Sequence, residues 1–301
     1  MAKKTRVAIV GTGNIGSDLA ERILASDDFD LVAVAGRRAQ SQNLSRLSLR
    51  AKYSSSEGLV GLKPFANEID GFFDATSAFD HRAHWDLIQS WGKWVVDLTP
   101  SKIGKPTVPV LADDFPGLGP ASSLISNYSM VTCGGQSSAP VIAAFSRSSK
   151  GVSEVEISSS ISSDSAGPAT RHNIDNYVQT TEALARSILG INRSKAILVL
   201  NPADPPPMMR TTVTVGASAV NLELAKRYLY QYVERIQMYI PGYSVAVEPF
   251  FVSADCVSAT VSVEGQGFYL PKHAGNLDII NAAAVETARM HALKNHRGTN
   301  V

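Results

Sequence analysis

The stretch that decides the fold is Arg6-Val7-Ala8-Ile9-Val10-Gly11-Thr12-Gly13-Asn14-Ile15-Gly16. Its β-branched run leads directly into a Gly-x-Gly-x-x-Gly turn, and a helical pattern follows to about residue 25. Between a strand and a helix these glycines predict a Rossmann nucleotide-binding turn; the alternative is a generic turn of an α/β domain. Gly11 makes the tight turn, Gly13 lets the backbone approach a pyrophosphate, and Gly16 allows close helix–strand packing. We therefore expect a dinucleotide to bind at the N-terminus of this helix, at Gly11, Thr12, Gly13, Asn14, Ile15 and Gly16.

The first part of the chain alternates short apolar runs with helical patterns, which is typical of a doubly wound parallel sheet. The predicted strands are 6–10, 31–35, 71–74, 94–97 and 129–132, and the predicted helices are 15–25 and 83–91.

From residue 133 onward the pattern becomes that of an α+β domain. Strands are predicted at 152–161, 196–200, 211–215, 245–252 and 257–263, of which the last two form an antiparallel pair. Helices are predicted at 170–189, 221–239 and 277–295, capped by Thr170, Asn221 and Asn276. The predicted fold is an α/β Rossmann dinucleotide-binding domain (1–132) plus an α+β catalytic and dimerisation domain (133–275), with a C-terminal helix (276–301) returning to the first domain.

A second chemical signal is the segment Met130-Val131-Thr132-Cys133-Gly134-Gly135-Gln136, which precedes an apolar helical run. A thiol at the start of a helix lies near the positive end of the helix dipole, which favours the nucleophilic thiolate. The glycines leave room for a substrate, and the Gln136 amide is a candidate donor to a developing oxyanion. The alternative reading is a small buried cysteine. Beside a nucleotide-binding domain, the segment predicts oxidation or reduction at carbonyl level through a Cys133 thioester.

Composition excludes several other classes of function. The 301 residues carry a net charge of +1, so no basic patch for nucleic acid or an anionic membrane is expected. Apolar runs stay far below the roughly 20 residues that span a bilayer. Two cysteines make no disulfide framework, and we expect a cytoplasmic enzyme without a metal site. His81 and His84 are predicted to face solvent on a helix, because no further ligand accompanies them.

Ordered blocks along nearly the whole chain resemble the acylating, CoA-dependent acetaldehyde dehydrogenases of aromatic meta-cleavage pathways. The matching blocks are GTGNIGSDL, FDATSAFDH, VDLTPSKIGKP, MVTCGGQ, ISSDSAGPATRHNID, NPADPP, YIPGY and YLPKHAGNLDI. The resemblance implies a homodimer that uses NAD or NADP to interconvert an aldehyde and coenzyme A with an acyl-CoA. It also implies association with a 4-hydroxy-2-oxoacid aldolase that passes the aldehyde through a tunnel.

Several residue roles follow from this resemblance. Cys133 matches the family's acyl-thioester nucleophile. Asn276 matches an asparagine that contacts the cofactor, and Asn173 and Ile174 match residues along the aldehyde route, although both could simply be helix positions. The loop that matches a dinucleotide-binding segment comprises Asp164, Ser165, Ala166, Gly167, Pro168, Ala169, Thr170, Arg171 and His172.

The chain departs from the family pattern at three places. Arg37 and Arg38 stand where the family usually has a carboxylate for the ribose hydroxyl, which favours NADP over NAD. Thr211 replaces an aspartate that acts as catalytic base or orienting group in the family, and the turn between 252 and 257 lacks a loop of about fifteen residues. An alternative function is therefore an NADPH-dependent reductase of a bulkier or aromatic activated acid, working with a partner ligase. A further alternative is a nucleotide-binding sensor without turnover, against which the Cys133 block argues.

Overall fold

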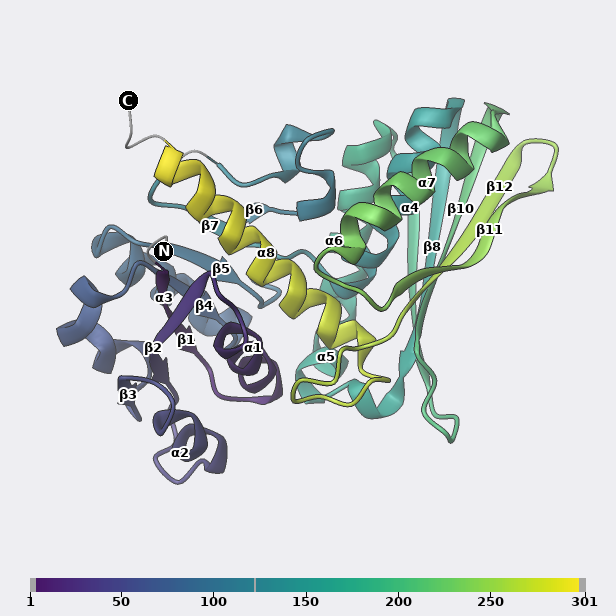
Figure 1. Cartoon of the computed structure of the whole chain (residues 1–301). Coiled ribbons are helices and arrows are strands. Elements are labelled where there is room, and N and C mark those ends of the chain that lie inside the picture. The colour runs from purple at the N-terminus through teal and green to yellow at the C-terminus, as the bar shows by residue number, and fades with distance from the viewer. Residues whose placement is uncertain (1–3, 122, 298–301) are drawn as a thin grey trace. The chain divides into compact units, whose positions relative to one another are not determined.

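A computed structural model describes residues 4–121 and 123–297 and divides the chain into two compact units (Figure 1). The first unit comprises the chain up to residue 107, residues 120–130 and the chain from 281 onward; the second comprises 108–119 and 131–280. The domain boundaries predicted from the sequence lie after residues 132 and 275. The sequence did not predict that residues 108–119 belong to the second unit. Among the residues described, no helix is long and apolar enough to cross a membrane.

The first unit is built on a seven-stranded parallel sheet in the order β3-β2-β1-β4-β5-β7-β6. Its strands are β1 (Thr5–Val10), β2 (Phe29–Ala35), β3 (Tyr53–Ser55), β4 (Gly71–Asp74), β5 (Trp94–Asp97), β6 (Lys105–Pro106) and β7 (Asn127–Ser129). Its helices are α1 (Asn14–Leu24), α2 (Gln42–Ser48), α3 (Ala78–Ser90), a 3₁₀ helix (Gly58–Glu68) and most of α8 (Gly275–Arg297). The predicted Rossmann fold class is confirmed.

Local residues explain where these elements begin and end. Most residues of β1, and all of β4 and β5, are buried, as expected for central strands of a parallel sheet covered on both faces. Helix α3 starts earlier than predicted because the Ser77 hydroxyl accepts a hydrogen bond from the Asp80 N–H. The predicted strand 129–132 is wrong in its second half, because Val131 has a φ of +52° and Thr132 already caps the next helix.

The second unit is a five-stranded sheet in the order β11-β12-β10-β8-β9, with α4, α6 and α7 on one face (Figure 1). The strands are β8 (Ser149–Ser162), β9 (Arg193–Asn201), β10 (Met209–Val220), β11 (Tyr243–Ser253) and β12 (Cys256–Val263). The helices are α4 (Cys133–Ser148), α5 (Pro168–His172), α6 (Ile174–Leu189) and α7 (Leu222–Gln237). Alternate residues of β10 from Met209 to Val215 are buried, so the opposite face of the sheet is left open.

Three predictions about this unit have clear outcomes. The antiparallel pair of β11 with β12 is confirmed. The predicted helix 170–189 is two helices, because Asn173 leaves the helical conformation at φ −115° and ψ 22°, and α5 starts after Gly167 rather than after Thr170. Asn276 does not cap the last helix from outside, because α8 already begins at Gly275.

Candidate active site

Cys133 is the first residue of α4, directly after a capping residue. The Thr132 Oγ1 accepts a hydrogen bond of 2.8 Å from the Gly135 N–H and lies 2.7 Å from the Thr181 Oγ1. Val131, a β-branched residue, precedes this cap in the left-handed region of backbone space. Such strain persists only where surrounding structure enforces it, and it often marks functional sites.

The protonation state of Cys133 differs from the sequence expectation. Burial raises the pKa of the thiol to about 12, while the N–H groups of Gly134 and of Cys133 itself lower this pKa by less. This direction is opposite to the thiolate expected from the start of the helix: desolvation of the partly buried Cys133 raises the pKa of its thiol more than the backbone N–H groups lower it. Attack on a carbonyl carbon then requires a proton acceptor during the reaction.

Buried hydroxyl groups lie close to the first turn of α4. The Ser137 Oγ, one turn after Cys133, lies 2.7 Å from the Thr211 Oγ1, which in turn lies 3.0 Å from the Ser159 Oγ. All three residues are fully buried. None of these hydroxyls is a base near neutral pH, but together they form a continuous path of hydrogen bonds.

The sequence did not predict that Ser137 and Ser159 belong to this site, nor that Tyr177 of α6 does, whose Oη would lie 1.9 Å from a Cβ built on Gly134. A signal existed for Ser159, because it occupies an inward-facing position of β8 between Ile157 and Ile161. A polar residue in such a core position must find hydrogen-bond partners, and here its partner is Thr211. Gln136 is likewise buried in α4.

In the first unit, the glycine turn has the shape expected of a phosphate cradle. Gly11 has a φ of +100°, and a Cβ there would lie 2.5 Å from the Ala75 carbonyl oxygen. A Cβ on Gly16 would lie 1.9 Å from the Gly11 carbonyl oxygen, so only glycine fits. A Cβ on Gly13 would meet nothing within 4 Å among the described residues, which leaves open space at the start of α1. This geometry suits a bound pyrophosphate.

The other residues of the glycine turn belong to the first unit, and so do Arg37 and Arg38. Thr12 is buried, Ile15 is half-buried and Asn14 is exposed at the first position of α1. Arg37 is exposed and forms an ion pair of 3.1 Å with Asp80, whereas Arg38 is exposed just after it.

The predicted cofactor loop 164–172 and residues 173, 174 and 276 belong to the second unit. The Arg171 guanidinium holds the loop through hydrogen bonds to the carbonyl oxygens of Ala166 (2.9 Å) and Ser163 (3.0 Å). Asn276 is 2% exposed, and its Oδ1 accepts no hydrogen bond from the described residues. Ser165 is buried, Asn173, Ile174 and Thr170 are half-buried, and Asp164, Gly167 and His172 are exposed; Pro168 and Ala169 open α5.

The prediction that His81 faces solvent is wrong. His81 is fully buried, with its Nδ1 2.8 Å from the Asp74 Oδ2 and its Nε2 3.5 Å from the Asp97 Oδ2. Burial opposes its charge, yet the Asp74 hydrogen bond and the Asp97 charge raise the pKa of His81. Burial raises the pKa of Asp97 to about 6. His84 is partly buried against the same Asp74 oxygen, at 2.8 Å.

Comparisons with known proteins identify the family. Residues 133–271 match the family model described as prokaryotic acetaldehyde dehydrogenase, dimerisation. The chain is 41% identical to an acetaldehyde dehydrogenase of Spirochaeta aurantia, over 98% of this chain and 97% of that one. It is 40% identical to one of Pectobacterium atrosepticum, over 96% of each. The chain belongs to the acetaldehyde dehydrogenase family. It is therefore an enzyme of the oxidoreductase class.

A solved structure supports the fold of this acetaldehyde dehydrogenase family member. Aspartate semialdehyde dehydrogenase II of Vibrio cholerae, complexed with ASA, superposes with a TM-score of 0.63 at 14% identity. The match covers 97% of this chain and 99% of that chain. At this identity the similarity shows a shared fold.

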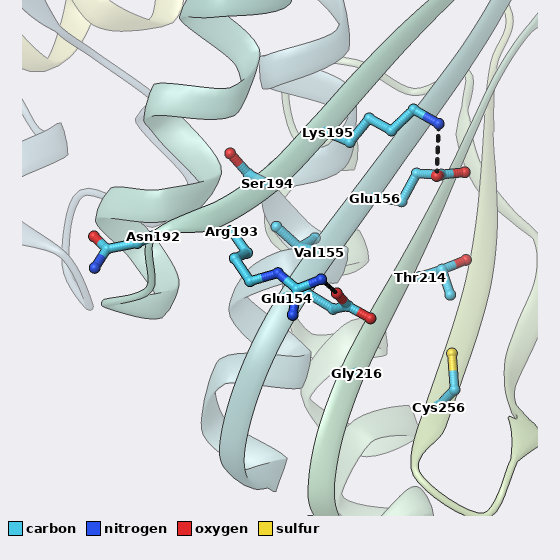
Figure 2. A pocket seen from close by; sticks show the side chains of 10 residues that line it. All are labelled: Glu154, Val155, Glu156, Asn192, Arg193, Ser194, Lys195, Thr214, Gly216 and Cys256. Carbon is cyan, nitrogen blue, oxygen red and sulfur yellow. Dashed lines mark ion pairs between the residues drawn. The ribbon is translucent and has the colours of Figure 1, made fainter.

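The family's dimerisation domain presents an open sheet face in this chain. Figure 2 shows a pocket on it, over β8, β9, β10 and β12, with ion pairs between Arg193 and Glu154 (3.0 Å) and between Lys195 and Glu156 (3.5 Å). Cys256 also lines this pocket. Hydroxyl pairs continue across the strands, with the Oγ1 atoms of Thr212 and Thr260 2.8 Å apart.

Proposed function

We propose that this protein is an NAD(P)-dependent acylating aldehyde dehydrogenase that interconverts an aldehyde and coenzyme A with an acyl-CoA through a thioester on Cys133. The observation that carries the proposal is the position of Cys133 at the start of α4, beside a glycine pair and a buried path of hydroxyls. The full-length similarity to proteins named acetaldehyde dehydrogenase supports acetaldehyde as a substrate.

In the oxidative direction the Cys133 sulfur adds to the aldehyde carbon, and the carbonyl oxygen becomes the hydroxyl of a thiohemiacetal. The Gln136 side chain is the proposed hydrogen-bond donor to this oxygen. A nicotinamide, when bound, would accept the hydride from this carbon; the hydroxyl proton of the thiohemiacetal leaves at the same time, so that a carbonyl group forms again. The remaining thioester on Cys133 is then attacked by the coenzyme A thiol, which takes the acyl group and returns the cysteine to its starting state.

The glycine cradle is the proposed pyrophosphate site, because it combines backbone N–H groups at the start of α1 with space above Gly13. Arg38 is the proposed partner of a ribose 2′-phosphate, so that NADP is preferred to NAD. Arg37 is the weaker candidate, because Asp80 already pairs with it. Residues 164–172 and Asn276 are proposed as further cofactor contacts, and Asn173 and Ile174 as the aldehyde route.

A second candidate function is favoured by Thr211, which stands where the resemblance expects a carboxylate. Without that acid, the reductive direction, from an acyl thioester and NADPH to an aldehyde, is the proposed alternative. A panel of acyl-CoAs of increasing bulk, assayed by NADPH consumption, distinguishes acetyl-CoA from a larger substrate.

The match to a dimerisation domain supports a homodimer, and we propose the open sheet face as its interface. Phe250 and Phe251 on β11 are 44% and 47% exposed, which adds apolar area to this strand. An aldolase or ligase partner stays a prediction from the resemblance.

The test of the proposed function is the formation of reduced cofactor from acetaldehyde, coenzyme A and NAD or NADP. We expect activity that requires coenzyme A for turnover and that Cys133→Ser abolishes, whereas Cys256→Ser retains it. Equal rates in the parent chain and in Cys133→Ser would rule the proposal out.

A further inference from the structure

Tyr177, in the first turn of α6, carries a buried hydroxyl without a hydrogen-bond partner among the described residues. The residue is 8% exposed, and its Oη forms no hydrogen bond with any described residue. Leaving a buried hydroxyl without a partner destabilises the folded chain, so native structures rarely retain one without a functional reason.

This hydroxyl lies over the first turn of α4. A Cβ built on Gly134 would lie 1.9 Å from the Tyr177 Oη and 3.0 Å from the Ser159 Oγ. Gly134 directly follows Cys133, so the absence of a side chain at position 134 is what makes room for the phenol beside the nucleophile. Burial and the negative charge of a Cys133 thiolate both raise the pKa of Tyr177, whereas the neighbouring hydroxyls of Ser159 and Thr181, which lie outside hydrogen-bond geometry, lower it by less. The phenol is therefore neutral and can donate its proton.

We propose that the Tyr177 hydroxyl relays a proton from the Cys133 thiol to the carbonyl oxygen of the substrate, an inference that rests on the proposed function. As the sulfur bonds to the carbonyl carbon, the S–H bond breaks and its proton passes to the phenol oxygen. The phenolic proton passes at the same time to the carbonyl oxygen, which has received the π electron pair of the carbonyl group. Tyr177 ends the step as a neutral phenol.

The relay explains how the Cys133 thiol can lose its proton at a site where no described residue has been identified as a base. Thr211 and Ser137 supply hydroxyls only, and the thiol of Cys133 keeps its proton near neutral pH. A hydroxyl that gives one proton while it takes another needs no carboxylate. The same relay serves the attack of Cys133 on an acyl-CoA carbonyl: the tetrahedral adduct then expels the coenzyme A sulfur, which takes the proton back from the hydroxyl oxygen and leaves as a thiol.

Two reactions of Cys133 test the relay without any nicotinamide. In the relay, acylation by acetyl-CoA places a proton on the carbonyl oxygen, whereas alkylation by iodoacetamide is a displacement at carbon that has no such step. Rates of both are measured by mass spectrometry of the Cys133 peptide in the parent chain and in Tyr177→Phe. We expect Tyr177→Phe to slow acylation by about 100-fold or more and to change alkylation by less than about threefold.

Tyr243→Phe is the matched control, because the Tyr243 hydroxyl is buried in the same unit and donates a 2.7 Å hydrogen bond to the Ser137 carbonyl oxygen. This variant should have a lower Tm than the parent chain. It should slow acylation and alkylation by the same factor, or slow neither of them. Tyr177→Phe should have a Tm equal to or above that of the parent chain, because it removes an unpaired hydroxyl.

An acylation rate of Tyr177→Phe within about threefold of the parent rate, or an equal fall in acylation and alkylation, overturns the relay alone. A parent chain that acquires no acetyl group on Cys133 overturns the proposed function, and the relay with it.

Discussion

The Thr211 Oγ1 lies 2.7 Å from the Ser137 Oγ, one helical turn beyond Cys133. The position that differs from the family pattern thus contacts the helix that carries the proposed nucleophile. Thr211 lies in β10, is fully buried, and also contacts the Ser159 Oγ at 3.0 Å. A change of charge at this position should therefore act on the chemistry of the cysteine.

We predict that Thr211→Asp gains acetaldehyde-oxidising activity and loses part of its reductive activity. A carboxylate can take the proton that leaves during attack, a role usually worth about 10²–10⁴-fold in rate, although it opposes a second negative charge at rest. Thr211→Asn is the matched control, similar in size but unable to act as a base. Rates with acetaldehyde and coenzyme A are compared at one pH. Equal rates in the Asp and Asn variants would mean that position 211 does not take part in proton transfer.

Cofactor preference is predicted to depend on Arg38. A guanidinium pairs with a 2′-phosphate through charged hydrogen bonds worth roughly 1.5–3 kcal/mol. Arg38→Asp should therefore shift the ratio of kcat/KM for NADP over NAD by roughly 10- to 100-fold toward NAD. Arg37→Asp should shift it less, because Arg37 already pairs with Asp80. A parent enzyme that prefers NAD contradicts the assignment.

The raised pKa of the Cys133 thiol predicts the pH dependence of its alkylation. With a pKa of about 12, the thiolate fraction grows about tenfold for each pH unit up to about pH 11. The rate of reaction with iodoacetamide, measured in a Cys256→Ser background, should rise steadily from pH 7 to pH 10. A plateau near pH 8 or below would show that the helix N-terminus outweighs burial.

His291 predicts an acid limit to stability. Burial lowers its pKa from 6.5 to about 4, and its Nδ1 lies 2.8 Å from the Tyr128 hydroxyl. Because the unfolded chain binds a proton at this site more readily, the folded state loses stability as pH falls from about 6.5 toward 4. The loss should reach about 2 kcal/mol at pH 5. Between pH 7 and pH 5, the free energy of unfolding of His291→Gln should therefore fall by about 2 kcal/mol less than that of the parent chain. The same dependence of the unfolding free energy on pH in both chains contradicts the prediction.

The sequence predicts the glycine turn and the Rossmann sheet well, because their determinants are local. Gly11 and Gly16 are required by backbone conformation and by close packing, and those requirements appear as a fixed spacing. The break at Asn173 has no such signal, because neither glycine nor proline marks it, and one helix was predicted where two exist.

Contacts between distant segments explain the other failures. Nothing adjacent to His81 in the sequence shows that Asp74 and Asp97 end neighbouring parallel strands and enclose its ring. The same holds for Tyr177, which reaches Gly134 only because α6 packs against α4. The raised pKa of Cys133 was not predicted either, because the sequence shows the start of the helix but not the desolvation of the thiol.

The central claim, that Cys133 carries the acyl group, is tested most directly by peptide mass spectrometry after incubation with acetyl-CoA. We predict a single acetyl group on Cys133, absent from Cys133→Ser and unchanged in Cys256→Ser. An acetyl group on Cys256, or none on Cys133 under conditions where the enzyme turns over, would contradict the account.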